Sequence, residues 1–332
     1  DPESTVVFVI NHRSNMDYVL VAFLAAEKTT LSYAVGEWAK IWPLQTLIRA
    51  MGAFFVRRNS GDPLYRCVLE RYVHMATKEG VCQAVFLEGG LSRDGHLRPP
   101  KLGFLDYMLR SYDPENDRDI VFIPVGVNYD RTLEDRSLLR ALDPDAEKRS
   151  HWFVVKTTLG FIWKSLILMI LSRWQRFGYA CVNFGKHVSI RQYCAENSVN
   201  FAKLERADRF LNVKKLADQL MGAIKDVIPA LPISLVATVM LESGHPGLGA
   251  LEVEARVNQL IKELQGRGAH VYVSPRNRVE SILSALNMLQ LRKLVRESGG
   301  IYRAVPEEMG VLAYYANAIA RWRQASDVSI DP

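Results

Sequence analysis

The sequence has little of what marks several classes of protein. Its 332 residues include only four cysteines, and no two of them have the close spacing of a zinc site or a redox pair. We therefore expect no bound metal and no disulfide framework, and a reducing compartment is the default. Acidic residues are outnumbered as well: the chain has 36 of them and 42 lysines and arginines, which gives a net charge of +6. That balance favours anionic partners, and it fits phosphates and lipid headgroups as well as nucleic acid.

Long apolar runs are also missing. No uninterrupted stretch reaches the roughly 18 residues expected of a membrane-spanning helix. The nearest approach is residues 157–171, which Lys164 interrupts. With the tryptophans and basic residues around it, the segment 150–178 is typical of a helix lying in a membrane interface, and a buried core helix fits equally. No aromatic-rich RNA motif or DNA-recognition element is present, so no nucleic-acid partner is expected.

Strand and helix patterns alternate through the first 130 residues, which predicts an α/β fold. We expect a mixed, largely parallel sheet flanked by helices, with extra C-terminal helices from a mostly helical remainder at 189–332. No clear linker divides the chain, so a single domain over 1–332 is predicted. Pro124, inside the apolar run 120–129, predicts a sheet edge, a bulge or a strand end. The first strand pattern starts at residue 5 without a preceding methionine, so we expect a fragment of a longer chain or a processed chain.

A histidine and a carboxylate five positions apart form the most informative pair. His12 follows the strand pattern at 5–10, and Asp17 lies in the first turn of the next helix pattern. Histidine can accept a proton near neutral pH, and a carboxylate on its other ring nitrogen fixes the tautomer. On one continuous helix the two side chains would diverge, so they can meet only across the turn before it. Ser14 with Asp17 also matches a helix capping box, a structural interpretation compatible with the catalytic one.

Charged residues follow two further strand patterns. Arg57 and Arg58 end one apolar run, and the segment Glu88–Arg93 follows another. Ligands of α/β proteins usually lie beyond the carboxyl ends of strands, so one crevice is expected to collect these residues and His12. Guanidinium groups suit phosphate, and glycines let the backbone approach a ligand. Taken alone, each group is also compatible with an ordinary turn or a solvated strand end.

Four segments, in this order, resemble the motif blocks of the glycerolipid acyltransferases. They are His12–Asp17 (HRSNMD, an HxxxxD block), Gly52–Arg58 (GAFFVRR), Phe86–Arg93 (FLEGGLSR) and Val121–Val125 (VFIPV). The fuller blocks are most similar to the glycerol-3-phosphate acyltransferase branch, including its dihydroxyacetone-phosphate relatives. The segments 179–185 (YACVNFG) and Tyr314–Asn317 (YYAN) resemble the same branch, so the resemblance spans nearly the whole chain. HxxxxD alone is a weak signal, whereas four ordered blocks are specific.

The resemblance implies a role for each matched residue. It implies that His12 is the general base and Asp17 its orienting partner. It implies an acyl-acceptor site made of Gly52, Phe55, Arg57, Arg58, Glu88, Gly89, Ser92 and Arg93, with Pro124 shaping the acyl-donor side. The branch usually has an arginine where this chain has Leu91. Its loss leaves Arg57, Arg93 or Lys101 to bind an acceptor phosphate, or else changes the acceptor.

The implied reaction moves a fatty acyl group from acyl-CoA or acyl carrier protein to the hydroxyl of glycerol-3-phosphate, in phospholipid biosynthesis. Dihydroxyacetone phosphate and lysophosphatidate are the alternative acceptors. No cofactor is implied beyond the thioester co-substrate. The implied partners are the phosphorylated acceptor, the thioester, a membrane lipid surface and acyl carrier protein. The implied location is peripheral, on the cytoplasmic face of the cell membrane.

Two other interpretations stay open. A cysteine hydrolase would use Cys67 or Cys82 as nucleophile, although buried structural cysteine is the better default. A non-catalytic, membrane-binding domain of the same fold would keep the basic, tryptophan-bearing surface without turnover.

Overall fold

The computed structural model describes residues 3–25, 31–36, 44–50, 52–57, 60–143, 178–244, 247–273 and 276–323. Two compact units divide the chain. The first consists of Asp1–Leu91, Leu97–Val127 and Val182–Ile228, and the second of Ser92–His96, Asn128–Cys181 and Pro229–Pro332. Where the sequence predicts a single domain, the described residues therefore form two units. The physical reason is that apolar residues from Ala230 onward pack into a cluster of their own, separate from the cluster around the sheet.

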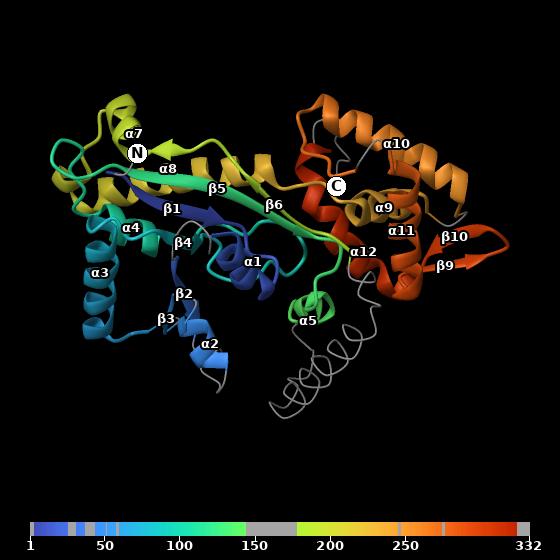
Figure 1. The fold of residues 1–332 in the computed structure, drawn as a ribbon, viewed down its shortest axis with the longest axis horizontal. Helices are drawn as coiled ribbons and strands as arrows, with labels where there is room; N and C mark the ends of the chain where they lie inside the picture. Colours follow the sequence, from blue (N-terminus) through green and yellow to red (C-terminus); the bar gives the residue numbers. More distant parts are fainter. Residues whose placement is uncertain are drawn as a thin grey trace. The chain divides into compact units, whose positions relative to one another are not determined.

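A mixed, largely parallel sheet is the centre of the first unit (Figure 1). Among the described residues its strands are β1 (Thr5–Ile10), β2 (Ser32–Gly36), β3 (Ala53–Val56), β4 (Gln83–Phe86), β5 (Ile120–Tyr129), β6 (Ala180–Phe184) and β7 (Val188–Ser189). The spatial order is β3-β2-β4-β1-β5-β6, and β7 also pairs with β5. β1 runs parallel to β4 and β5, and β2 runs parallel to β3 and β4, whereas β7 is antiparallel to β5. The predicted α/β class is confirmed.

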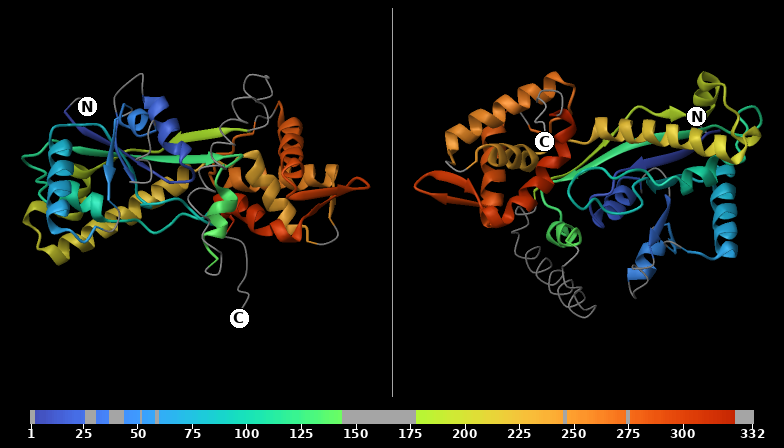
Figure 2. Two further views of the ribbon diagram at one scale, coloured as in Figure 1. Left: turned by 90° about the horizontal axis from the view of Figure 1, so that it is seen from below. Right: turned by 180° about the vertical axis from the view of Figure 1, so that it is seen from behind.

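Helices flank this sheet. They are α1 (Met16–Ala25), α2 (Leu44–Ala50), α3 (Pro63–Lys78), α4 (Gly103–Leu109), α7 (Ile190–Asn197) and α8 (Arg206–Val227), with a 3-10 turn at Phe201–Lys203. Apolar side chains of α3, α4, α7 and α8 join those of β1 and β5 in one core. Figure 2 shows α8 along one face of the sheet and α1 on the other. The helix that follows His12 therefore lies on the opposite face from this core.

Pro124 lies within the sheet, which corrects the prediction of a sheet edge or strand end. It pairs in register with Val9 of β1, and β6 and β7 lie on the other side of β5. The Pro124 carbonyl accepts from the Gly185 backbone N–H at 2.7 Å. The nitrogen and carbonyl of one strand residue face the same neighbour, so the missing N–H points toward residues 185–187. There the chain passes from β6 to β7, so no strand faces Pro124 at the position where its N–H is missing. The interruption of the ladder that a proline requires therefore lies in the neighbouring segment.

The second unit is built around one largely buried helix. Nine residues of α9 (Pro232–Glu242) are buried, and α10 (Ala250–Gly266), α11 (Arg278–Leu291) and α12 (Met309–Ala316) contact it. The unit also contains α5 (Asp135–Arg140), short 3-10 turns at Pro306–Glu308 and Asn317–Trp322, and a sheet of β8 (Leu248–Gly249), β10 (Ile301–Ala304) and β9 (Val295–Ser298).

The β9–β10 hairpin is a departure from the predicted helical C-terminal region. Its turn is Gly299-Gly300, with both φ angles positive at 60° and 80°. Two adjacent residues with positive φ make the type I′ turn that matches strand twist, and a Gly-Gly pair is a known signal for it. β9 is polar and exposed after Val295, and β10 is a short strand of mainly half-buried residues, so apolar alternation did not reveal the strands.

No helix in the described ranges combines the length and the apolar character needed to cross a membrane. Apart from Gly178, the predicted interface segment 150–178 lies outside the described residues.

Candidate active site

His12 and Asp17 meet across the turn between β1 and α1, as the sequence predicts. His12 Nδ1 lies 2.9 Å from Asp17 Oδ2. Both side chains are enclosed, with exposed fractions of 2% and 0%. The same Oδ2 accepts the backbone N–H groups of Arg13 at 2.7 Å and Ser14 at 3.1 Å. One carboxylate oxygen therefore fixes the shape of the turn and the orientation of the imidazole together.

The capping box is present as well. Ser14 Oγ accepts the Met16 N–H at 3.1 Å, and the Asp17 carboxylate accepts the Ser14 N–H in return. These bonds satisfy N–H groups that the start of α1 leaves without helical partners. Asp17 thus caps the helix and orients the histidine through the same geometry.

An amide side chain anchors the turn to the sheet. Asn11 Oδ1 accepts the Val127 N–H at 2.7 Å, and Asn11 Nδ2 donates to the Val127 carbonyl at 2.9 Å. The side chain imitates a peptide group and continues the ladder between β1 and β5 past Ile10. Sequence reasoning missed this residue, because an asparagine next to a histidine carries no distinctive signal.

Aromatic rings surround the other side of the imidazole. The Tyr18 hydroxyl lies 3.4 Å from His12 Nε2, and the Phe86 ring centroid lies 4.2 Å from that of His12. Tyr18 in turn stacks on Tyr33, with centroids 5.6 Å apart. Nε2 is the nitrogen left to exchange a proton once Nδ1 is bonded to Asp17. Tyr18 was not among the predicted site residues, and its place directly after Asp17 was the available signal.

Glu88, in the third motif block, links that block to the turn between β1 and α1. Its Oε1 accepts the His12 backbone N–H at 2.8 Å and its Oε2 accepts the Arg98 backbone N–H at 2.7 Å. The side chain is 0% exposed. Burial raises the pKa of this carboxyl to about 7, while the two backbone N–H groups, Arg13 and Arg98 act in the opposite direction. The resemblance implies that Glu88 contacts the acceptor; in the structure both of its oxygens accept backbone N–H groups, one of them that of His12.

We expect Glu88 to make stability depend on pH. Its folded-state pKa of about 7 lies above the ordinary 4.5, so the folded protein holds the proton more tightly. The contribution of this proton to the free energy of unfolding is fully present below the ordinary pKa and is lost as pH rises through about 7. The loss amounts to about 3 kcal/mol. Urea unfolding at pH 5 and pH 7.5 should show a larger loss in the wild type than in Glu88→Gln. Burial also raises the pKa of the Asp130 carboxyl, to about 6, so Asp130 contributes to the loss in both proteins. Equal losses in both proteins would contradict the assignment.

Gly89 and Lys101 lie together beside Glu88. Gly89 has φ of 63°, and a Cβ built on it would lie 2.7 Å from Lys101 Cγ. The Lys101 backbone N–H donates to the Leu87 carbonyl at 2.7 Å. Gly89 and Lys101, both predicted as site residues, therefore lie beside Glu88, whose carboxylate accepts the His12 backbone N–H.

The second-block residues lie at the end of the strand order. Phe55 and Arg57 help line a cavity of about 390 Å³, and Arg57 lies over the Tyr65 ring, 5.6 Å from its centroid. The carboxyl ends of β3 and β1 point to the same edge of the sheet, as predicted. Two strands separate them, so Arg57 starts roughly 14 Å along the sheet from His12. Gly52 makes the turn before β3 with φ of 91°, and Arg58 lies outside the described residues.

Ser92 and Arg93 belong to the second unit. Ser92 Oγ donates to the His96 carbonyl at 2.7 Å, and Arg93 Nη1 donates to the Ala141 carbonyl at 3.3 Å. The YYAN motif contacts the same loop, residues 92–96, because Asn317 Nδ2 donates to the Asp94 carbonyl at 2.9 Å.

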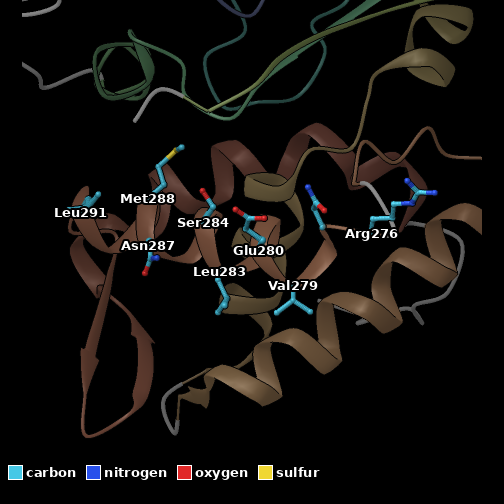
Figure 3. A pocket seen from close by; sticks show the side chains of 9 residues that line it. Arg276, Val279, Glu280, Leu283, Ser284, Asn287, Met288 and Leu291 are labelled. Atoms are coloured by element: carbon cyan, nitrogen blue, oxygen red, sulfur yellow. The ribbon is translucent and has the colours of Figure 1, made fainter. Parts of the chain in front are cut away.

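A hollow of about 580 Å³ elsewhere in the second unit follows α11, past Glu280, Ser284 and Met288 (Figure 3). No predicted site residue lines that hollow.

The candidate nucleophiles of the cysteine hydrolase interpretation lie on other elements than the histidine. Cys67 is exposed on α3. Cys82 directly precedes β4, whereas His12 follows the carboxyl end of the parallel strand β1. The two therefore stand at opposite ends of the sheet.

Comparison with known proteins matches both parts of the chain. Residues 1–128 match the acyltransferase family model, and residues 165–322 match the glycerol-3-phosphate acyltransferase C-terminal region. A glycerol-3-phosphate acyltransferase of Pseudomonas fluorescens is 30% identical over 264 residues, which are 77% of this chain and 30% of that protein. One from Pseudomonas syringae is 27% identical over 329 residues, 96% of this chain and 38% of the relative.

A third relative of the same name, from Xanthomonas campestris, is 29% identical over 338 residues, covering 98% of this chain and 37% of its own. The chain spans about a third of the length of these relatives. Both family models match, one over the motif blocks and one over the C-terminal region, so the chain belongs to the glycerol-3-phosphate acyltransferase branch of the glycerolipid acyltransferases.

Proposed function

We propose that the protein transfers a fatty acyl group from a thioester to the hydroxyl of glycerol-3-phosphate, as a step of phospholipid synthesis. The observation that carries the proposal is the enclosed His12–Asp17 pair at the carboxyl end of β1. The relatives are named glycerol-3-phosphate acyltransferases, and their name supports the choice of acceptor.

In the proposed reaction, His12 Nε2 takes the proton of the acceptor hydroxyl as its oxygen attacks the thioester carbonyl carbon. The carbon–oxygen bond forms, the carbonyl becomes a tetrahedral oxyanion, and its collapse breaks the carbon–sulfur bond. The leaving thiolate then takes the proton from the imidazolium. Asp17 stabilises that imidazolium through Nδ1, as a buried carboxylate does in a catalytic triad. The Tyr18 hydroxyl, 3.4 Å from Nε2, makes a contact long enough for an acceptor hydroxyl to displace.

The proposal includes a setting for the reaction. The donor carrier is acyl-CoA or acyl carrier protein, no metal or further cofactor takes part, and the enzyme works on the cytoplasmic membrane surface. The net charge of +6 supports attraction to anionic lipid. An exposed apolar stripe on α3 adds to this, with Leu64, Val68 and Met75 exposed by 72%, 59% and 51%.

One assay tests these statements together. The purified full-length protein is given labelled acyl-CoA with glycerol-3-phosphate, dihydroxyacetone phosphate and lysophosphatidate in competition. EDTA is present, and anionic vesicles are added or omitted. We expect glycerol-3-phosphate to be acylated preferentially, with higher turnover when vesicles are present. Vesicle binding without any acyl transfer would instead favour the non-catalytic membrane domain, and preference for another acceptor would correct the substrate.

A further inference from the structure

The acceptor in the proposed function carries a phosphate, and the motif position that usually supplies an arginine is Leu91 in this chain. A phosphate near the reacting hydroxyl needs a cation that can reach the region of His12. Leucine has no donor and no charge. Either another residue supplies the cation or the phosphate is held less firmly.

Arg98 places a guanidinium next to the position that lacks one. Its Nη1 donates to the Leu91 carbonyl at 3.4 Å. Its backbone N–H donates to Glu88 Oε2, and the other oxygen of that carboxylate accepts from the His12 backbone. The guanidinium also lies close enough to Glu88 to lower the pKa of its carboxyl. The bond to Glu88 holds the Arg98 backbone, and the residue is only half-buried, so part of it remains accessible to solvent.

The other cations of the first unit are less well placed. Arg57 follows β3, which β2 and β4 separate from β1. Arg13, in the turn between β1 and α1, is only 2% exposed. Lys101 lies beside Gly89 and adds a single ammonium group. A guanidinium offers the planar pair of donors that matches phosphate oxygens, and an ammonium does not.

We propose that Arg98 takes the place of the arginine missing at Leu91 and binds the phosphate of the acceptor. This inference rests on the proposed function. The backbone N–H groups of Arg98 and His12 donate to the two oxygens of the same Glu88 carboxylate, so the two residues start from neighbouring positions. In the proposed complex, the short glycerol backbone bridges a phosphate on the Arg98 guanidinium and a hydroxyl on His12 Nε2. Glu88 then sets the spacing between the group that binds and the group that reacts.

Steady-state kinetics of the full-length protein test this. Arg98→Gln keeps the side chain as far as the Nε position and removes the charge. It should raise the KM for glycerol-3-phosphate by about 10- to 100-fold, the usual size of a charge-assisted hydrogen bond, and leave the KM for acyl-CoA unchanged. The double variant Leu91→Arg with Arg98→Leu moves the guanidinium back and should restore most of the lost affinity. Arg206→Gln, exposed at the start of α8, is the matched control for net charge and should have the wild-type KM.

The outcomes separate the inference from the function beneath it. An active wild type with an unchanged acceptor KM in Arg98→Gln overturns the role of Arg98 alone. If the double variant fails to reverse the rise in KM, or if Arg206→Gln reproduces that rise, the exchange of positions 91 and 98 is overturned. A folded wild type that transfers no acyl group to any acceptor overturns the proposed function, and the inference with it.

Discussion

Replacing His12 with alanine should lower the rate of acyl transfer by about 10³-fold. The proposed mechanism gives this side chain both proton transfers, one from the acceptor hydroxyl and one to the leaving thiolate. General acid–base catalysis by a positioned side chain is worth about 10²–10⁴-fold. The remaining rate would come from holding the two substrates together. Initial rates at saturating acyl-CoA and glycerol-3-phosphate measure the effect, and the KM values should change far less than kcat.

The control for this experiment concerns folding. The His12 ring is 2% exposed and packs against Phe86 and Tyr18, so alanine leaves a cavity that costs about 2–4 kcal/mol. His12→Gln fills more of that space and cannot act as a base. Both variants should be equally inactive, although their thermal midpoints differ. Normal turnover in a variant that keeps the wild-type circular dichroism spectrum would rule out His12 as the base.

Much of the local structure at this site could be read from the sequence because it depends on neighbours along the chain. A strand, a turn and a helix start follow one another between residues 5 and 17, and their signals are apolar runs, a capping pair and helical spacing. The contact between His12 and Asp17 followed from these local signals, since the pair could meet only across that turn. The structure shows that contact at 2.9 Å.

Features that depend on strand order could not be read in the same way. The sequence indicates that Arg57 ends a strand. That two other strands separate β3 from β1 is decided by pairing between residues far apart in the sequence. Likewise, Pro124 lies inside the sheet because the interruption falls in the partner segment 185–187. Glu88 illustrates a third limit. Its partners are backbone N–H groups of His12 and Arg98, and a bond to backbone leaves no mark on the sequence of the partner.

Asp17 should show its two roles in two different measurements. One oxygen, Oδ2, accepts from His12 Nδ1 and from the backbone N–H groups of Arg13 and Ser14. The amide oxygen of asparagine can occupy the same position and keep all three bonds. Asp17→Asn therefore removes the negative charge while it preserves the turn. We expect the rate of acyl transfer to fall by roughly 10²- to 10⁴-fold, because the imidazolium formed during the reaction loses its counter-charge.

Asp17→Ala removes the bonds together with the charge. It should lose at least as much activity as Asp17→Asn, and it should also lose about 1–2 kcal/mol of stability, because the start of α1 loses its cap. Chemical unfolding and initial rates, measured on both variants, separate the two effects. The turn geometry predicts that asparagine keeps near-wild-type stability without activity. If asparagine instead retained full activity, the carboxylate would matter only as a helix cap, and His12 would have to act without a charged partner.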